Sequence, residues 1–489
     1  MPSLRRLTLG PGAWSLLAGL ALSLTACSFV PSIQKPVTKS DLPATYAPAG
    51  PGSAATFTRW WTGFNDPTLD RLVDTVLVRN LDLRAAVARV EEVQNRYRIS
   101  RAGQFPSVDL TVQGTRTSTP TNSGTTGSFS ENIPNFPDRF NITSYSASLG
   151  FAYELDFWGR ARATKNAALH EFVASRADAE TALIGVVSET VATYHEITDL
   201  EAQLSLTREN TSLLEERSDL SKDRYRRGLI SSFELYTIQQ EFEDARSNLP
   251  VLESRLRDAT GRLAVLLGSY PQTARDMLSL KPDSTVKLGS IPAGLPSELL
   301  RQRPDLIAAE ERLEAARQRI GIARAARFPR LALTAVGGTQ SSDLANLVNT
   351  GQQFTNLAGS LTAPIFNAGA LKANVGVAWA QYRQQAAIYE KAVLTAFKEV
   401  DAALVNFQKQ KDRFSFLRNA TSNARASVET QRDRYVRGIG DYLAYLDAQR
   451  NLVRVELSLA TARRAVYDAR LAVHRALGGA WIETPANPS

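Results

Sequence analysis

Residues 82–106 read DLRAAVARVEEVQNRYRISRAGQFP, and residues 305–329 read DLIAAEERLEAARQRIGIARAARFP. Both segments begin with Asp-Leu and end with Phe-Pro. Proline lacks a backbone N–H and disfavours the helical conformation at the residue before it. Each helix should therefore end ahead of this pair, near Ala102 and near Ala325. The two copies indicate that the chain is a duplication of one unit.

The duplication continues far beyond this first match. The first match has an offset of 223 residues, whereas Gly159 corresponds to Gly369, an offset of 210. The second offset holds without a gap as far as Gly268 and Gly478. A length difference of 13 residues therefore lies between the Phe-Pro pair and Gly159. Two copies are too few for a solenoid, which needs about three or more repeats, so a duplicated hairpin of helices fits better.

Alternating apolar and polar residues follow each Phe-Pro pair. The apolar positions are Val108, Leu110 and Val112, then Tyr145, Ala147, Leu149, Phe151 and Tyr153, and in the second half Leu331, Leu333 and Ala335, then Leu357, Leu361 and Ala363. Strands of roughly ten residues with one apolar face and one small or polar face are typical of transmembrane barrels. A soluble sandwich is disfavoured because only four such strands occur, between very long helices.

Those helices are the second signal. The segment from residue 160 to about residue 227 contains no helix breaker, so it should form one helix of roughly 100 Å. Another helix is expected from about Ser231 to Leu267. Its end spaces apolar residues by threes and fours, as coiled coils do. They are Leu249, Leu252, Leu256, Ala259, Leu263 and Leu266, repeated by Leu459, Ala462, Val466, Ala469, Val473 and Ala476. Pro250 lies inside this pattern and should kink the helix.

The N-terminus resembles that of an exported lipoprotein. Arg5 and Arg6 precede a short apolar segment, which ends in Leu-Thr-Ala-Cys at Cys27. This resembles a lipobox, so we expect a signal peptide over residues 1–26 and a lipid on Cys27. An ordinary signal peptide cut elsewhere is the alternative, but Cys27 is the only cysteine of the chain. Ser28, where inner-membrane lipoproteins often carry Asp, implies transfer to the outer membrane.

Composition argues against several other classes. The formal net charge of +8 is spread along helical segments, so no nucleic-acid groove is expected. The phosphate-loop and dinucleotide-binding motifs are absent from the sequence. The three histidines are scattered, which indicates no metal site and no cofactor. Because no convergent set of acids, bases or ligands is present, we expect no enzyme activity.

Several motifs together resemble the TolC-like outer-membrane efflux factors, in particular their lipoprotein branch, often labelled NodT-type. They are Trp60-Trp61 with Asp66-Pro67; Glu154-Leu155-Asp156-Phe157-Trp158-Gly159-Arg160; Gly294-Leu295-Pro296 with Arg303-Pro304-Asp305; Ala363-Pro364-Ile365-Phe366; and Leu446-Asp447-Ala448-Gln449. The family usually has Leu-Phe-Gly where this chain has Phe157-Trp158-Gly159, a conservative departure. The resemblance covers essentially the whole chain after residue 27.

The resemblance implies a mainly α fold with a β-barrel portion. Three chains of four strands each would form a trimeric 12-stranded transmembrane β-barrel, because four strands cannot close and lipid does not tolerate open edges. A long periplasmic α-helical coiled-coil barrel would continue it. The expected domains are the signal peptide 1–26, a lipid-anchored Pro-rich segment 27–57, a first outer-membrane efflux repeat 58–268, a linker 269–296, a second repeat 297–478 and a tail 479–489.

The resemblance also implies a gate and a docking surface. Leu443 matches the position that narrows the tunnel in lipoprotein members, Asp447 matches the acid of the Leu-Asp-Ala-Gln motif, and Arg434 is its expected partner across the tip. Docking to other proteins is expected at the helix-turn-helix tips, around Tyr225, Arg227, Gly228, Tyr435, Arg437 and Gly438. Two alternatives stay open. Asp447 can be an ordinary solvated carboxylate, and Gly228 and Gly438 can serve only as turn residues.

The implied function is passive: the exit duct of a tripartite efflux system, anchored by lipid in the outer membrane. Its implied partners are two further copies of the chain, a periplasmic adaptor protein and an inner-membrane RND-type pump. An exit duct for an ATP-driven type I secretion system is the alternative within the same class. A long-helix structural envelope protein is the alternative from another class, and it leaves the four alternating strands unexplained.

Overall fold

The computed structural model describes residues 29–33, 59–121, 137–278 and 303–479. The predicted signal peptide, Cys27, the motif at Gly294 and nearly all of the tail 479–489 lie outside the described residues. The chain divides into two compact units. The sheet unit takes its residues from 1–34, 93–172 and 312–386, and the helical unit from 35–92, 173–311 and 387–489.

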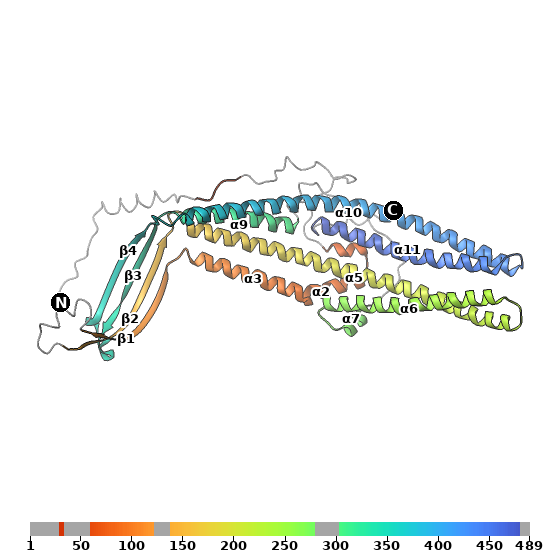
Figure 1. The fold of residues 1–489 in the computed structure, drawn as a ribbon, viewed down its shortest axis with the longest axis horizontal. Helices are drawn as coiled ribbons and strands as arrows, with labels where there is room; N and C mark the ends of the chain where they lie inside the picture. Colours follow the sequence, from red (N-terminus) through yellow and green to blue (C-terminus); the bar gives the residue numbers. More distant parts are fainter. Residues whose placement is uncertain (1–28, 34–58, 122–136, 279–302, 480–489) are drawn as a thin grey trace. The chain divides into compact units, whose positions relative to one another are not determined.

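The long helices occur in pairs of equal length (Figure 1). Helices α3 (Leu81–Ala102) and α9 (Pro304–Ala325) each have 22 residues, α5 (Arg160–Arg226) and α10 (Ala370–Val436) each have 67, and α6 (Ser232–Leu266) and α11 (Tyr442–Ala476) each have 35. The predicted duplication is therefore confirmed, and α3 and α9 end where the Phe-Pro pairs predict. Pro250, which is expected to kink α6, lies inside this helix, and the helix continues on both sides of it.

Shorter elements precede and follow these helices. The 3₁₀ turn η2 (Trp60–Phe64) leads into α2 (Pro67–Arg79), and α7 (Pro271–Met277) lies within the predicted linker 269–296. The 3₁₀ turns η4 (Leu344–Asn346) and η5 (Thr350–Gln352) connect two strands. Within the described ranges, none of the helices has the length of apolar sequence that a membrane span needs.

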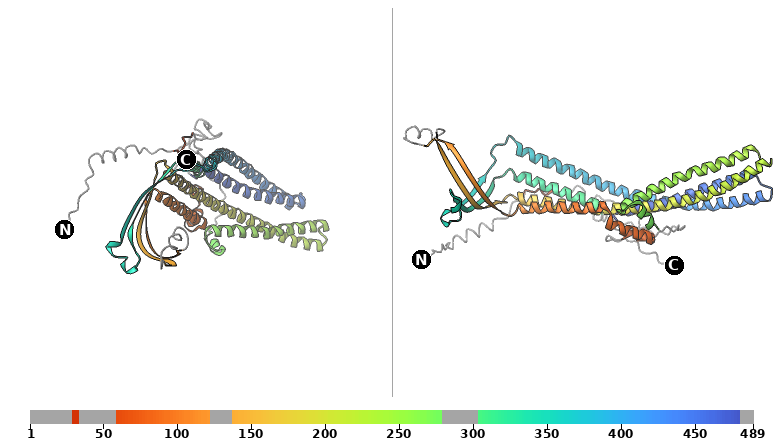
Figure 2. Two further views of the ribbon diagram at one scale, coloured as in Figure 1. Left: turned by 60° about the vertical axis from the view of Figure 1, so that its left-hand side comes forward. Right: turned by 90° about the horizontal axis from the view of Figure 1, so that it is seen from below.

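The four predicted strands are all present and form one sheet in the sheet unit (Figures 1 and 2). Strands β1 (Ser107–Pro120), β2 (Arg139–Leu155), β3 (Arg330–Ser341) and β4 (Gln353–Thr362) are antiparallel in the order β1-β2-β3-β4. The two halves of the chain meet at the central pair, where Leu155 lies opposite Leu331. A Cβ on Gly338 would lie 2.2 Å from the carbonyl oxygen of Ala147 across this pair, so the strands approach as closely as glycine allows.

The sheet of a single chain is largely open. Every residue of β1 is exposed, and the apolar side chains of Val108, Leu110 and Val112 are 65–70% exposed. Among the described residues the outer edges of β1 and β4 have no neighbouring strand. Both features require a covering that the described part of one chain does not supply, because unpaired edges and exposed apolar faces are costly in water.

A short motif fixes the junction between β2 and α5. The Asp156 carboxylate accepts hydrogen bonds from two backbone N–H groups in the first turn of α5, at 3.0 and 2.8 Å, and so caps the helix. The guanidinium of Arg160 donates to Glu154 at 2.8 Å. The indole N–H of Trp158 donates to the carbonyl of Pro329 at 2.7 Å, which ties this junction to the Phe-Pro pair of the second half.

The helical unit is held by the predicted coiled-coil stripes. Buried positions include Leu252, Ala259, Leu263 and Leu266 in α6, and Ala462, Val466, Ala469, Val473 and Ala476 in α11. Arg303 is buried at the start of α9 and donates to Asp305 at 2.7 Å, to Glu399 of α10 at 2.8 Å and to the carbonyl of Ala476 at 3.0 Å. The Arg-Pro-Asp motif therefore fastens three helices of the second half together.

Candidate functional site

Each pair of long helices ends in a tight turn at the tip of the helical unit. Gly228 (φ +73°) and Gly438 (φ +72°) have left-handed backbones, as predicted for glycines that end a helix. The N–H of Leu229 donates to the carbonyl of Arg224 at 2.9 Å, and the N–H of Ile439 donates to Arg434 at 3.0 Å. These bonds satisfy carbonyls that the helix end leaves free.

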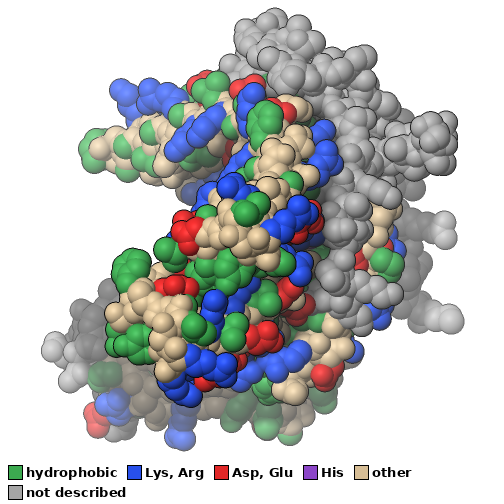
Figure 3. All heavy atoms as spheres, turned by 90° about the vertical axis from the view of Figure 1, so that its right-hand side faces the viewer, with side chains coloured by type: hydrophobic (Ala, Val, Ile, Leu, Met, Phe, Trp, Pro, Cys, Tyr) green, Lys and Arg blue, Asp and Glu red, His purple; other side chains and the backbone are tan. Residues whose placement is uncertain are grey.

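The tips expose apolar and basic side chains together. At the first tip Leu229 is 63% exposed and Phe233 is 70% exposed, and at the second Val436 is 75% exposed. Tyr225 and Arg227 are also exposed. Figure 3 faces this end of the helical unit and shows hydrophobic and basic side chains interspersed over it. A mixed surface of this kind is typical of a protein–protein contact.

The predicted gate residues lie on both sides of the second tip: Arg434 is in the last turn of α10, and Leu443 and Asp447 are in the first turns of α11. Leu443 is partly buried, and its N–H is capped by the Asp441 carboxylate at 3.1 Å. Asp447 is exposed and pairs with Arg450, three residues along the same helix, at 3.1 Å. Within the described part of one chain, no ion pair joins Arg434 to Asp447. The structure thus gives Asp447 a partner that the sequence analysis did not name.

Hydrogen bonds also connect the two hairpins near their tips. Arg217 of α5 donates to the hydroxyl of Tyr445 at 3.2 Å, donates to Gln449, and stacks over the Tyr445 ring at 5.2 Å. Arg224 of α5 donates to the hydroxyl of Tyr435 at 3.0 Å, and this bond raises the pKa of its guanidinium. These two arginines hold the α5–α6 hairpin against the α10–α11 hairpin.

A third link comes from Arg450. Its guanidinium pairs with Glu241 of α6 as well as with Asp447 of α11. The Glu241 side chain is largely buried, whereas Asp447 is 68% exposed. We call the contacts made by Arg217, Arg224 and Arg450 the tip latch. These three residues were not predicted from the sequence, because nothing local signals which residues of one hairpin meet those of the other.

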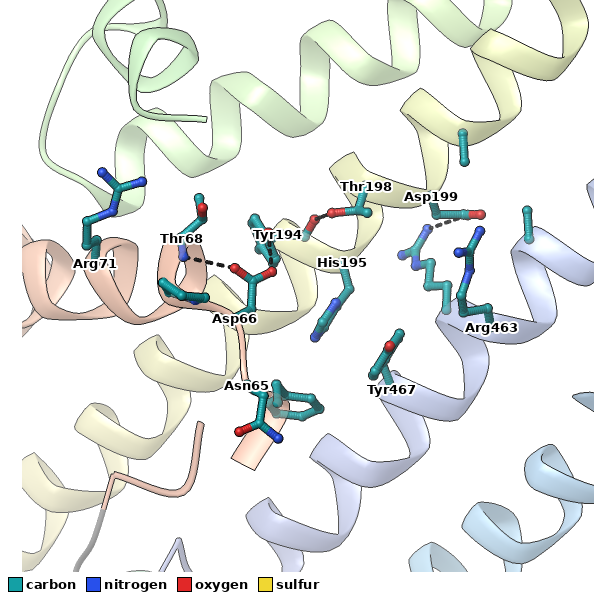
Figure 4. Close-up of a pocket in the computed structure, with 15 residues that line it drawn as sticks. Asn65, Asp66, Thr68, Arg71, Tyr194, His195, Thr198, Asp199, Arg463 and Tyr467 are labelled. Atoms are coloured by element: carbon teal, nitrogen blue, oxygen red, sulfur yellow. Dashed lines mark hydrogen bonds and ion pairs between the residues drawn. The ribbon is translucent and has the colours of Figure 1, made fainter. Parts of the chain in front are cut away.

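A second cluster lies in a pocket between η2, α2, α5 and α11 (Figure 4). Asp66 caps α2 by accepting the N–H of Thr68 at 2.9 Å, and it also accepts the hydroxyl of Tyr194 at 2.5 Å. Burial is the main cause that raises the Tyr194 pKa. The Asp-Pro motif is thereby joined to α5.

Two buried histidines, His195 of α5 and His474 of α11, make ring contacts in the same region. His195 stacks on Tyr467 of α11 with ring centroids 4.4 Å apart, and His474 stacks on Trp60 at 4.9 Å. Burial lowers the pKa of His195 to about 4 and that of His474 to about 3. Arg464 lowers the His195 pKa further, against an opposing effect of Asp66. Both rings are therefore neutral at pH 7 and act as packing residues.

The described residues contain no group of three or more His, Cys, Asp or Glu side chains that could hold a metal ion. The residues that line the pocket in Figure 4 instead pack the start of the first half against α5 and α11. The tip latch is the better functional candidate, because its contacts are partly exposed and join two separate helical hairpins.

The two buried histidines predict acid sensitivity. A histidine that is neutral when folded but takes a proton when unfolded, near pH 6.5, stabilises the fold fully above that pH and progressively less as pH falls toward the folded pKa. For His195 the full loss is roughly 3 kcal/mol. We expect the melting temperature to fall between pH 7 and pH 4.5, and to fall less in His195→Gln, measured by calorimetry in detergent. Equal slopes for both proteins would contradict this assignment.

The chain matches a known protein family along both of its halves. A family model described as outer membrane efflux protein matches residues 72–269 and again residues 295–479. The solvent efflux pump outer membrane protein SrpC of Pseudomonas putida is 34% identical over 467 residues, which cover 94% of this chain and 97% of that protein. The cation efflux system protein CusC of Escherichia coli is 30% identical over 465 residues, which cover 94% of this chain and 97% of that protein.

A solved structure agrees with these sequence matches. The crystal structure of a membrane protein from Pseudomonas aeruginosa superimposes with a TM-score of 0.81 at 30% sequence identity. The match covers 92% of this chain and 100% of that chain. Similarity therefore extends over both halves of the duplication and over the sheet as well as the helices.

Proposed function

Because the chain belongs to the outer membrane efflux protein family, we propose that three copies of it form the exit duct of a tripartite efflux system. The observation that carries this proposal is the match of the family to both halves of the chain, together with the four-stranded sheet whose edges are open. The duct conducts substrates passively to the exterior. A periplasmic adaptor and an inner-membrane pump supply selection and energy.

The open sheet supports the trimer. In hydrocarbon each unpaired backbone N–H or C=O costs several kcal/mol, so a four-stranded sheet with two free edges is not stable there. Three copies joined from β4 of one to β1 of the next give twelve strands and leave no edge. The apolar residues exposed on β1, such as Leu110, then face lipid.

The exposed tips support docking of the adaptor. Glycine turns present Leu229 and Phe233 at one tip and Val436 at the other, with arginines beside them. The transported substrate is set by the pump rather than by this chain, and the relatives differ accordingly, since one is named for solvents and another for cations. A proton-driven pump is the proposed energy source, as expected for a lipoprotein member.

The trimer and the duct are tested together. In detergent, native mass spectrometry should give the mass of three copies, and the same preparation should conduct ions in planar lipid bilayers. A chain that conducts as a monomer would contradict the proposed assembly. A stable trimer that never conducts, even when the tip latch is removed, would contradict the duct itself.

The lipid anchor is the second part of the proposal. Cys27 itself lies outside the described residues, but Phe29 stacks on Phe328 with ring centroids 4.5 Å apart. Arg317 donates to the carbonyl of Pro31 at 2.8 Å. The chain just after Cys27 is thus fastened beside the Phe-Pro pair at the sheet, where an attached lipid would reach the membrane.

The anchor is tested by mass spectrometry of the N-terminal peptide of the mature protein. A diacylglycerol-modified Cys27 at the first position is expected. An unmodified cysteine, or cleavage at another bond, would refute the assignment. Cys27→Ala should lose the lipid and still give a trimer, because the sheet rather than the anchor supplies the subunit contacts.

The gate is the third part. Leu443 lies on the second tip, and three copies around one axis would form an apolar ring that ions cross poorly. The tip latch holds the two hairpins of each chain together and so keeps the ring narrow. Its exposed pairs are each worth about 0–1 kcal/mol, so three sets of them bias the closed state by an amount that a docking partner can overcome.

Conductance of variants in planar bilayers tests the gate. Arg217→Ala removes bonds between the two hairpins and should raise the open probability. Its matched control is Arg208→Ala, which removes an exposed pair with Glu253 inside the α5–α6 hairpin and should change nothing. Leu443→Ala should raise single-channel conductance by widening the ring.

The predicted acid at Asp447 is tested in the same assay. Asp447→Ala removes the carboxylate that positions the Arg450 guanidinium beside Glu241 of α6, so this link between the hairpins should weaken and the open probability should rise moderately. Raised salt should open the wild type more than this variant, because ions screen the pair that the variant lacks. Unchanged conductance in Leu443→Ala and Asp447→Ala, with the trimer intact, would place the constriction elsewhere.

A further inference from the structure

All four junctions between helix and strand lie at one end of the sheet. The register shows this directly, because Ser107 at the start of β1 pairs with Ala152 near the end of β2. Leu155 pairs with Leu331 near the start of β3, and Arg330 pairs with Thr362 at the end of β4. Residues from four separate segments therefore share one rim of the sheet unit (Figure 1).

This rim carries an excess of positive charge. The junction segments 101–107, 154–162, 326–331 and 362–372 contain six basic residues and two acidic residues. The two acids are already engaged: Glu154 pairs with Arg160, and Asp156 accepts backbone N–H groups of α5. Five cations are left, Arg101, Arg162, Arg327, Arg330 and Lys372, and we call them the basic collar.

The side chains of the basic collar are free to bind something else. All five residues are exposed, and within the described part of the chain none of their side chains takes a hydrogen bond or ion pair. The opposite end of the sheet differs. Its described segments carry Arg116 and Arg139 against Asp138 and Asp343, so charge is balanced there.

Exposed apolar side chains accompany the collar on the same rim. Phe105 is 61% exposed, Phe366 is 89% exposed and Ile365 is 92% exposed, all in the junction segments. A band that mixes aromatic rings with long basic side chains suits the boundary between hydrocarbon and water, where rings enter the apolar layer and guanidinium groups reach the headgroups.

We propose that the basic collar binds the phosphate groups of anionic phospholipids in the periplasm-facing leaflet of the outer membrane. The proposal rests on the insertion of the sheet into that membrane, as argued above. Clustered arginines at a membrane surface attract anionic headgroups, and guanidinium groups bind phosphate through paired N–H donors. Three copies would bring fifteen such cations to one ring, which sets the depth of the trimer in the bilayer.

The test uses the full-length trimer in detergent with added lipid. Native mass spectrometry should show phosphatidylglycerol bound at least tenfold more than phosphatidylcholine, with a preference that falls as salt rises. Inorganic phosphate at equal concentration should not compete well, because it lacks the acyl chains. The triple variant Arg101→Gln, Arg162→Gln, Arg327→Gln should lose the preference, and the corresponding lysine variant should keep most of it.

A matched triple variant distinguishes the effect of the basic collar on lipid binding from the effect of the protein's net charge. Arg255→Gln, Arg257→Gln and Arg418→Gln remove three exposed cations of the helical unit that take no side-chain partner in the described chain. This variant should keep the lipid preference. Equal loss in both triple variants would overturn the proposal, since net charge alone would then explain the binding.

Other outcomes are also decisive. A wild type that forms a conducting trimer but binds both lipids equally would overturn the collar proposal and leave the duct standing. Dissociation of the collar variant into monomers without any anionic lipid would overturn it too, because the cations would then pair with acids of a neighbouring copy. A wild type that neither trimerises nor inserts would instead contradict the proposed function.

Discussion

Backbone hydrogen bonding at the sheet edges is the constraint on which the rest of the molecule depends. Four antiparallel strands satisfy one another internally, but β1 and β4 each keep an outer edge that no described segment of the chain covers. A strand edge in a membrane must be paired, because lipid offers no donor or acceptor. The described single chain therefore leaves two strand edges unpaired, which neighbouring copies would pair in the proposed trimer. The exposed apolar side chains of β1 and the junction cations would then face lipid.

Much of this architecture was predictable because it depends on local sequence motifs and on the internal repeat. The Phe-Pro pairs fixed the ends of α3 and α9 at Ala102 and Ala325, and the constant offset made α10 and α11 copies of α5 and α6. The strand at Leu357 followed from alternation alone. All of these features depend on residues that are neighbours in the sequence. The kink expected in α6 also came from a local signal, Pro250, and the helix continues on both sides of this residue.

The tip latch could not be predicted because its partners are far apart in sequence. Arg217 and Tyr445 are separated by 228 residues, and their contact depends on the packing of two hairpins. By contrast, the pair of Asp447 with Arg450 has the spacing of neighbours on one helix and could have been predicted. The expected partner Arg434 came from a resemblance and lies on the other side of the turn. The buried histidines were likewise seen only as scattered residues, since their stacking on Tyr467 and Trp60 needs three separate elements.

The equal lengths of the paired helices limit how such a protein can change over time. Each residue added to a helix turns everything beyond it by about 100° and advances it by 1.5 Å. A single insertion in α5, between residue 173 and Arg217, would turn the first hairpin away from Tyr445 and Tyr435 while the second hairpin kept its place. After the gene duplication, the side chains of the two halves could therefore diverge, but the lengths of the paired helices had to stay equal. Any lengthening that survives has to come in whole helical turns, or be matched in both halves, so insertions are expected to accumulate in the loops at the far end of the sheet and in the linker.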